Sequence, residues 1–196
     1  MNASGDALVA SDLALVRGGR LLFEGLNFRV ARGEALLVTG PNGAGKSSLL
    51  RLIAGLLEAF EGQLENPFAT ALQAGEPALK SDRRLGSELA FWARLDGADT
   101  AAVLAAATQM AIDTLLDLPC AMLSAGQRQR AALARMIASG APLWLLDEPT
   151  AALDATSETR LLHAIAAHRA NGGLVVAVTH HALAIPDAMP LRISGA

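Results

Sequence analysis

The sequence predicts a single α/β domain built around a mostly parallel β-sheet. Three short apolar runs, residues 35–39, 142–146 and 174–179, have the composition of strands that are buried on both faces. Between them lie longer segments whose apolar residues recur at helical spacing, and such alternation builds a parallel sheet with helices on both faces. The length of 196 residues suits one domain of slightly above average size.

The N-terminal part is expected to begin with antiparallel strands. Apolar and polar side chains alternate there, and Gly18 and Gly19 provide a turn in the middle. A buried run then leads through a glycine-rich turn into a pattern typical of a helix. The expected elements of this part are strands at 7–16, 26–30 and 35–39, a helix at 47–57, and one or two short strands within 64–72.

The rest of the chain is expected to be helical between its buried strands. Ser124 is a residue type that caps helix N-termini, and Asn171, Gly172 and Gly173 have the composition of a helix C-terminal stop. The expected helices cover residues 88–95, 100–112, 124–139 and 155–170.

Composition and charge exclude several classes of protein. A net charge of −3 argues against a surface that neutralises many phosphates, so no nucleic-acid partner is expected. The longest run without Asp, Glu, Lys or Arg, residues 170–186, has 17 residues and contains several polar ones, which is unsuitable for a membrane span. Residues 1–12 lack the features of a secretory signal. The single cysteine, Cys120, can form neither an internal disulfide nor a zinc cluster and is expected to be buried.

A phosphate-binding loop is predicted at residues 40–47. The residues are Gly40, Pro41, Asn42, Gly43, Ala44, Gly45, Lys46 and Ser47, which fit the pattern G-x-x-x-x-G-K-[ST] between a buried strand and a helix. Glycines let successive N–H groups turn toward one anion, and the helix directs its positive end at the phosphates. Lys46 adds a full charge, Ser47 is expected to bind magnesium, and Ser48 completes the candidate site. A glycine-rich turn with a solvated lysine is the alternative, which the flanking strand and helix disfavour.

Two carboxylates follow the second buried strand. Asp147 and Glu148 are adjacent, and because side chains alternate along a strand they are expected to point to different places. Asp147 suits a magnesium ligand, and Glu148 suits a group that polarises an attacking water. His180 follows the third buried strand at the same sheet edge and is expected near a γ-phosphate. Taken alone, the Asp147 and Glu148 pair would fit a solvated strand end, and His180 would fit an ordinary surface histidine.

A second anion site is predicted at the start of the helix after Leu123. Ser124, Gly126 and Gln127 lie there, and small residues at a positive helix end let phosphate approach the backbone. The segment LSAGQRQRAALARM resembles the signature motif and helix of ATP-binding cassette (ABC) ATPases. GPNGAGKSS, LWLLDEPTAALD and VTHH are similar to the other motifs of that family and occur in the family's order.

This resemblance implies a P-loop ATPase cassette that binds ATP and Mg²⁺. Its fold would comprise a mostly parallel core sheet, an antiparallel N-terminal β subdomain and a compact helical subdomain at about 76–140, all in one nucleotide-binding domain of residues 1–196. Two copies would pack head to tail, so that each ATP lies between one chain's phosphate loop and the partner's signature helix. Asp154 matches the family's loop that links the two sites, and on sequence alone it is also a helix N-cap.

Two positions depart from the family's common pattern. Where many members carry an aromatic ring that stacks on adenine, this chain has Arg17, whose planar guanidinium can stack on a base. The glutamine that couples the nucleotide site to the membrane partner corresponds to Gln73 or, in another alignment, is replaced by Glu76. Gln73 is also considered as a magnesium ligand.

Within the family, the small size and the signature sequence most resemble the CcmA subfamily, the ATPase subunits of the cytochrome c biogenesis (haem exporter) system. This implies a peripheral location on the cytoplasmic face of the bacterial inner membrane, with CcmB-like and CcmC-like permease subunits. No direct haem binding is expected, because Cys120 lacks a Cys-x-x-Cys-His context and His163 and His168 are expected on a polar helix face. The alternatives are another small ABC exporter, a soluble ABC-type ATPase or a non-catalytic nucleotide-binding regulator.

Overall fold

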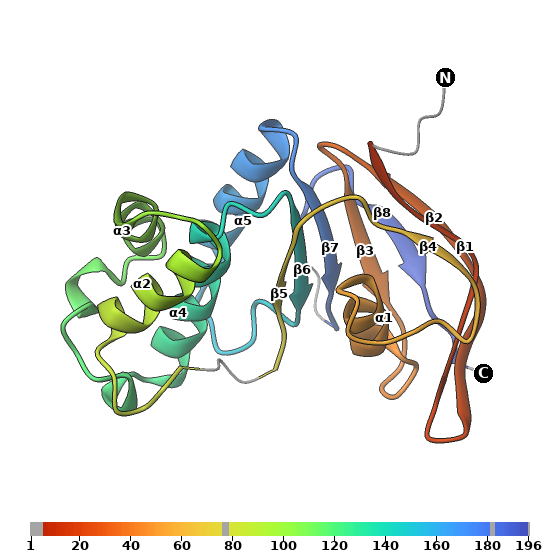
Figure 1. The fold of residues 1–196 in the computed structure, drawn as a ribbon, viewed down its shortest axis with the longest axis horizontal. Helices are drawn as coiled ribbons and strands as arrows, with labels where there is room; N and C mark the ends of the chain where they lie inside the picture. The colour runs from red at the N-terminus through yellow and green to blue at the C-terminus, as the bar shows by residue number, and fades with distance from the viewer. Residues whose placement is uncertain (1–5, 76–78, 181–182, 196) are drawn as a thin grey trace.

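Two β-sheets lie side by side in the computed structural model, which describes residues 6–75, 79–180 and 183–195 (Figure 1). An antiparallel sheet contains β1 (Ala7–Arg17), β2 (Arg20–Ala31) and β4 (Glu61–Glu65) in the order β2-β1-β4. The second sheet is entirely parallel. Its order is β5-β6-β7-β3-β8, with β3 at Ala35–Thr39, β5 at Thr70–Gln73, β6 at Leu143–Asp147, β7 at Leu174–Val178 and β8 at Met189–Arg192. The predicted fold class is confirmed.

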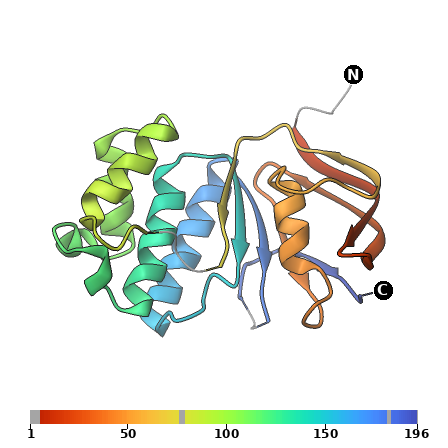
Figure 2. The same cartoon turned by 60° about the horizontal axis from the view of Figure 1, so that its bottom comes forward.

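Helices cover both faces of the parallel sheet. Helix α1 (Lys46–Ile53) lies between the two sheets, whereas α4 (Ala125–Ala138) and α5 (Ala155–Ala170) lie on the opposite face (Figures 1 and 2). Helices α2 (Leu85–Leu95) and α3 (Thr100–Gln109) pack outside α4. Two short 3₁₀ turns, Asp113–Leu115 and Cys120–Met122, connect α3 to α4. Helices α2, α3 and α4 lie within the range 76–140 expected for a helical subdomain, and that division of the domain stays a prediction; residues 76–78 lie outside the described part of the chain.

Alternate residues of β6 build two different hydrophobic cores. Leu143 and Leu145 join α1 and the antiparallel sheet, and Trp144 and Leu146 join the core formed by α2 to α5. All four side chains are buried. A strand that buries both faces has no solvent side, which explains why β6 reads as an unbroken apolar run.

Two predicted helices end earlier than expected. Helix α1 ends at Ile53 rather than residue 57, because Gly55 adopts a left-handed conformation with φ of 73°. Helix α3 ends at Gln109 rather than residue 112, and Ala111 follows with φ of 51°. Strand β8 was not predicted: it contains Pro190, which suits it to the sheet edge, where a missing N–H leaves no ladder bond unmade.

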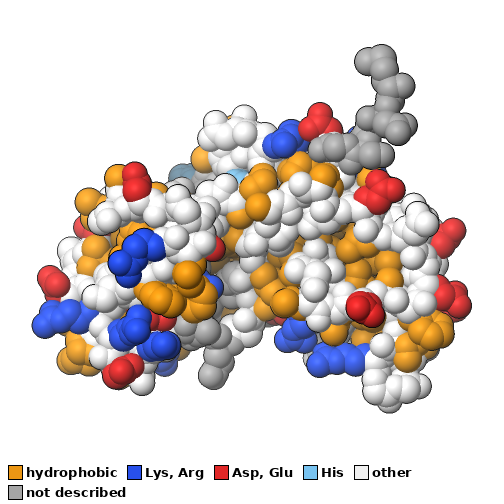
Figure 3. All heavy atoms as spheres, viewed as in Figure 1, with side chains coloured by type: hydrophobic (Ala, Val, Ile, Leu, Met, Phe, Trp, Pro, Cys, Tyr) orange, Lys and Arg blue, Asp and Glu red, His pale blue; other side chains and the backbone are white. Residues whose placement is uncertain are grey.

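The surface mixes apolar and charged side chains. On the face in Figure 3, hydrophobic patches over the helices and over the sheets are interrupted by Lys, Arg, Asp and Glu. Within residues 6–75, 79–180 and 183–195, none of the helices is both long enough and apolar enough to cross a bilayer.

Candidate nucleotide site

The loop between β3 and α1 has a shape that only glycine can supply at two positions. Gly40 has φ of 146°, and a Cβ there would overlap the carbonyl oxygen of Ile193. Gly45 has φ of 100° as the N-cap of α1, where a Cβ would lie 3.0 Å from side-chain atoms of Leu22 and Phe23. Two of the glycines predicted for phosphate binding, Gly40 and Gly45, are therefore needed so that the loop can pack against its neighbours without a side chain in the way.

Lys46 crosses this loop. Its side chain is buried, and Nζ donates hydrogen bonds to the carbonyl oxygens of Gly40 and Pro41, each at 2.9 Å. The ammonium group is thereby fixed at the mouth of the loop rather than extended into solvent. A full positive charge held beside the N-terminus of α1 creates a site for an anion.

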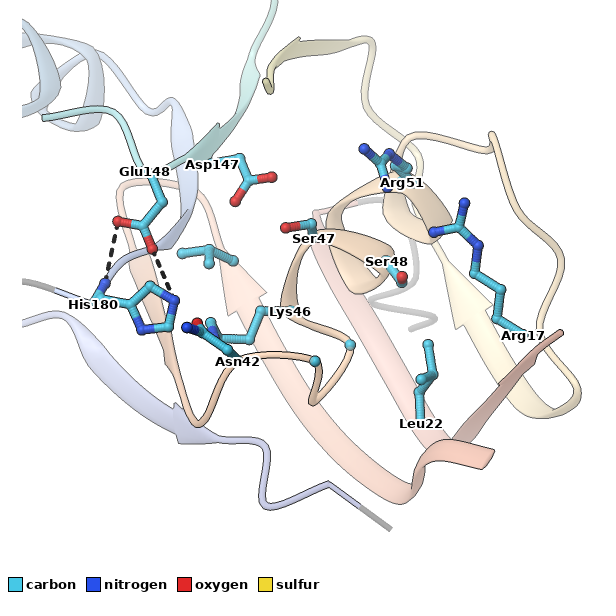
Figure 4. Close-up of a pocket in the computed structure, with 13 residues that line it drawn as sticks. Arg17, Leu22, Asn42, Lys46, Ser47, Ser48, Arg51, Asp147, Glu148 and His180 are labelled. Carbon is cyan, nitrogen blue, oxygen red and sulfur yellow. Dashed lines mark hydrogen bonds and ion pairs between the residues drawn. The ribbon is translucent and has the colours of Figure 1, made fainter. Parts of the chain in front are cut away.

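The loop opens into a cavity of about 370 Å³. Most of the predicted nucleotide-binding and catalytic side chains contribute to its walls, together with three residues that the sequence did not single out (Figure 4). The lining residues are Arg17, Leu22, Asn42, Gly43, Gly45, Lys46, Ser47, Ser48, Arg51, Asp147, Glu148, Val178 and His180. Sequence analysis did not identify two apolar residues and one arginine of this lining, because no motif marks them. They are Leu22, Val178 and Arg51. Gly40, Pro41 and Ala44 shape the loop without lining the cavity.

Ser47 and Asp147 face each other across the cavity. Ser47 lies in the first turn of α1 and Asp147 ends β6, and Figure 4 shows their oxygens directed toward the same space. A hydroxyl and a carboxylate are oxygen ligands of the kind that Mg²⁺ prefers, with water and substrate phosphates completing its shell. The two residues therefore fit the predicted magnesium site.

Glu148 and His180 form a pair on the other side of the cavity. Glu148 Oε2 accepts a hydrogen bond from the backbone N–H of His180 at 3.2 Å, and Oε1 lies 3.5 Å from His180 Nε2 (Figure 4). The backbone N–H of Glu148 donates to the carbonyl of Val178 at 2.9 Å, which ties the end of β6 to β7. Glu148 has φ of 49°, a left-handed conformation that turns its side chain away from that of Asp147. The expected divergence of the two carboxylates is thus produced by this turn.

The predicted second anion site lies at the tip of α4. Ser124 is the N-cap: its Oγ accepts from the N–H of Gln127 at 3.2 Å, and Gln127 Oε1 accepts from the N–H of Ser124 at 2.8 Å. Ser124 is exposed, and Ser124, Gly126 and Gln127 are absent from the lining of the cavity around Lys46. The helix tip therefore faces outward, where a second molecule can approach it.

Asp154 caps α5. Its Oδ1 accepts from the N–H of Ser157 at 2.7 Å, and the hydrogen bonds from the backbone and side chain of Ser157 lower the pKa of the Asp154 carboxyl below its usual value. The capping role is confirmed. A role of Asp154 between two nucleotide sites stays a prediction.

The structure separates Gln73 from the expected magnesium site. Gln73 ends the edge strand β5, pairs in register with Leu146, and lines a second cavity of about 550 Å³ between β5 and α4. It is not among the residues that line the cavity around Lys46, because β6 and β7 lie between β5 and β3. Gln73 is buried and its Oε1 has no hydrogen-bond partner in the described residues. Glu76, the other candidate for the coupling position, lies outside the described residues.

One expectation about the histidines is wrong. His168 does not lie on a polar face: its ring stacks on Trp144 with centroids 3.8 Å apart, and Nε2 lies 3.1 Å from the carbonyl oxygen of Pro142. Burial lowers the pKa of His168 below its ordinary value. Helical periodicity underestimated this burial because the contact is made at the end of α5, over the start of β6. His163 is exposed and Cys120 is buried, as expected.

A glycine loop with a buried lysine, a strand-end Asp-Glu pair, a histidine just after the neighbouring strand and the exposed signature tip of α4 together are typical of an ATP-binding cassette ATPase. Residues 23–151 match the family described as ABC transporter. The chain belongs to the ABC transporter family, and within it to the cytochrome c biogenesis ATP-binding export proteins called CcmA.

Two curated relatives show this sequence similarity. A cytochrome c biogenesis ATP-binding export protein CcmA of Sphingopyxis alaskensis is 53% identical over 92% of this chain and 93% of its own length. The protein of the same name from Zymomonas mobilis is 48% identical over 95% of this chain and 84% of its own length.

Solved structures share the fold. A bacterial Atm1-family ABC exporter with ATP bound has a TM-score of 0.85 and 26% identity, covering 99% of this chain and 38% of the exporter. An ABC transporter ATP-binding protein of Pyrococcus furiosus, described as putative, has a TM-score of 0.84 and 22% identity over 95% of this chain and 97% of its own.

Proposed function

We propose that this chain is the ATP-hydrolysing subunit of the export system of cytochrome c biogenesis. Its relatives at 53% and 48% identity are named cytochrome c biogenesis ATP-binding export proteins. The resemblance to that subfamily implies haem export or release of the haem-loaded chaperone. The chain would work at the cytoplasmic face of the bacterial inner membrane, with permease subunits that resemble CcmB and CcmC. Nucleic acid and haem itself are not among the proposed ligands.

The observation that supports hydrolysis, rather than binding alone, is the Glu148 and His180 pair. Glu148 accepts the backbone N–H of His180 through Oε2, and its Oε1 faces the imidazole of the same residue. Glu148 also lines the cavity around Lys46, so its carboxylate can accept a proton from a water molecule bound there. The imidazole of His180, 3.5 Å away, holds the carboxylate in place and lies beside the same cavity.

The loop residues bind and orient the nucleotide. Backbone N–H groups of residues 42–47 and the ammonium of Lys46 would hold the β- and γ-phosphates, and the side chains of Ser48 and Asn42 line the same space. Arg17 and Leu22 lie at the end of the cavity away from Glu148, where the guanidinium can stack on the base.

Magnesium fits the oxygens of Ser47 and Asp147. When bound, the ion neutralises charge that develops on the phosphate oxygens. Ser47 and Asp147 would hold it on the side of the cavity that faces away from His180.

A second copy of the chain would complete each site. Ser124, Gly126 and Gln127 lie outside the cavity of their own chain, and the exposed tip of α4 would bind the γ-phosphate of ATP held by the partner. Asp154 would lie close to this interface. Activity would then depend on dimer formation.

Glu148→Gln tests the catalytic assignment. The amide keeps the shape of the side chain but cannot accept the proton, so ATP should bind and the dimer should form while kcat falls by about 100-fold or more. The measurement is steady-state ATPase activity with nucleotide affinity by titration. Glu65→Gln, an exposed carboxylate on β4, is the matched control and should retain the parental rate. A parental kcat for Glu148→Gln would refute the role of Glu148.

The export role has its own test. In a bacterium that lacks its own CcmA, the wild-type chain should restore haem-containing cytochrome c, and Glu148→Gln should not. Co-purification of a CcmB-like membrane subunit with the wild-type chain would support the proposed complex. Restoration of cytochrome c by Glu148→Gln would contradict a role for hydrolysis in this process.

A further inference from the structure

A buried amide joins helix α4 to the segment that carries Glu148. Gln129 is only 6% exposed, and its Nε2 donates a hydrogen bond of 2.9 Å to the carbonyl oxygen of Pro149. Pro149 is itself buried and directly follows Glu148. This contact joins α4 to the segment that follows β6, the strand next along the chain.

The same face of α4 makes a second close contact with this segment. A Cβ at Gly126 would lie 2.8 Å from the carbonyl oxygen of Ala152, so the first turn of α4 approaches the backbone of residues 148–153 as closely as glycine permits. Gly126 and Gln129 are three residues apart and therefore neighbours on one helix face. Helix α4 is thus fixed to the segment after β6 at two points.

The segment itself is strained and needs such support. Glu148 and Ala152 have φ of 49° and 62°, which non-glycine residues rarely adopt, and each costs about 1 kcal/mol or more. Only short turn bonds stabilise the segment from within, such as the bond from the N–H of Ala151 to the carbonyl of Glu148 at 3.0 Å. On one side it is tied to β7 through Val178, and on the other to α4 through Gln129.

We infer that Gln129 is a positioning residue that couples the two nucleotide sites of the dimer. The tip of α4 would bind the ATP held by the partner, whereas Glu148 acts on the ATP held by its own chain. A shift of α4 on binding one nucleotide is passed through Gln129 to Pro149 and from there to the carboxylate that acts on the other. This inference rests on the proposed function.

A purely structural role would make a different prediction. Gln129 would then only satisfy a buried carbonyl, and its loss would lower stability without changing the rate of the folded enzyme. The chain offers a matched control for this case. His168 contacts the carbonyl of Pro142, the proline just before β6, as Gln129 contacts the proline just after it. The His168 contact lies at the opposite end of the strand from the cavity.

The test compares Gln129→Met with His168→Phe in the full chain. Each change removes one side-chain contact to a proline carbonyl and keeps the bulk of the side chain, so both should lower Tm. Gln129→Met should in addition reduce kcat by about tenfold or more, since small displacements of a catalytic group have effects of this size. Its KM for ATP should stay within about twofold, and the Hill coefficient for ATP should fall from above 1 to 1. His168→Phe should keep kcat and the Hill coefficient.

Gln129→Glu gives a readout that does not depend on Met being tolerated. A carboxylate cannot donate to Pro149, but a protonated carboxyl can, so kcat relative to wild type should rise as the pH is lowered from 8.5 to 5.5. A parental kcat and Hill coefficient for Gln129→Met, or a pH-independent ratio for Gln129→Glu, would overturn the inference. Because wild-type hydrolysis and its loss in Glu148→Gln are measured separately, failure of the coupling can be distinguished from failure of the proposed function.

Discussion

At the scale of single residues, Lys46 shows how one side chain is prepared for an anion. Burial of an ammonium group is costly unless its donors are used, and here two carbonyl oxygens of the loop accept them. The same two bonds fix the charge at the mouth of the loop, where phosphate oxygens can replace or join the carbonyls as acceptors. The cost of burying the charge is therefore offset before the nucleotide arrives.

Lys46→Ala should weaken ATP binding roughly ten- to hundredfold, because hydrogen bonds to a charged group contribute about 1.5–3 kcal/mol. The affinity is measured by titration with a fluorescent ATP analogue. Lys80 is the only other lysine in the chain and is exposed, so Lys80→Ala is the control and should bind ATP as the parent does. Equal affinities for the parent and Lys46→Ala would show that the ammonium does not face the phosphates.

At the scale of elements, the parts that sequence could predict are those fixed by local patterns. Strand β7 is entirely apolar and β3 and β6 are apolar up to their last residue, and the start of α4 carries a capping box from Ser124 to Gln127. Strand β8 escaped prediction because Pro190 argues against a strand unless the strand is known to lie at an edge. Which strands are neighbours is decided by the tertiary structure and not by local sequence.

In the site, too, local sequence predicts some residues and the tertiary structure places the others. Lys46, Ser47, Asp147, Glu148 and His180 were predictable because motifs and strand ends place them at one sheet edge. Leu22 reaches the cavity only through the packing of β2 against α1, and the position of Gln73 in a second cavity follows from the strand order. No local pattern encodes these placements.

The stacking of His168 in α5 on Trp144 in β6 should make the stability of the folded chain depend on pH. Burial lowers the pKa of His168 in the folded chain, so the unfolded chain, with a histidine pKa near 6.5, binds the proton more readily. The stability that neutral, buried His168 gives the folded chain is therefore present above about pH 6.5 and is lost as the pH falls below that value. Tm should drop between pH 7.5 and 5.5 by more in the parent than in His168→Phe. His163→Phe, an exposed change on the same helix, should keep the parental dependence; an unchanged pH dependence in His168→Phe would contradict this account.

At the scale of the whole molecule, the two predicted anion sites do not meet within one chain. The cavity around Lys46 is lined by the glycine loop and α1, by side chains of β1 and β2, and by the ends of β6 and β7, while Ser124 at the tip of α4 is exposed and contributes nothing to it. A symmetric dimer in which the same two surfaces meet twice would use both sites and create two equivalent nucleotide sites. This arrangement makes a prediction that no single-chain site can share.

Mixing two inactive variants should restore activity. Ser124→Asp keeps an N-cap acceptor for Gln127 but places a negative charge against the partner's phosphates, and Ser124→Asn is its neutral control. Lys46→Ala disables the loop and leaves α4 intact. In a dimer of one Ser124→Asp chain and one Lys46→Ala chain, one site combines two defects and the other combines an intact loop with an intact helix tip. ATPase activity should therefore exceed that of either variant alone. If both components of a site came from the same chain, every site in the mixture would carry a defect and mixing would restore nothing.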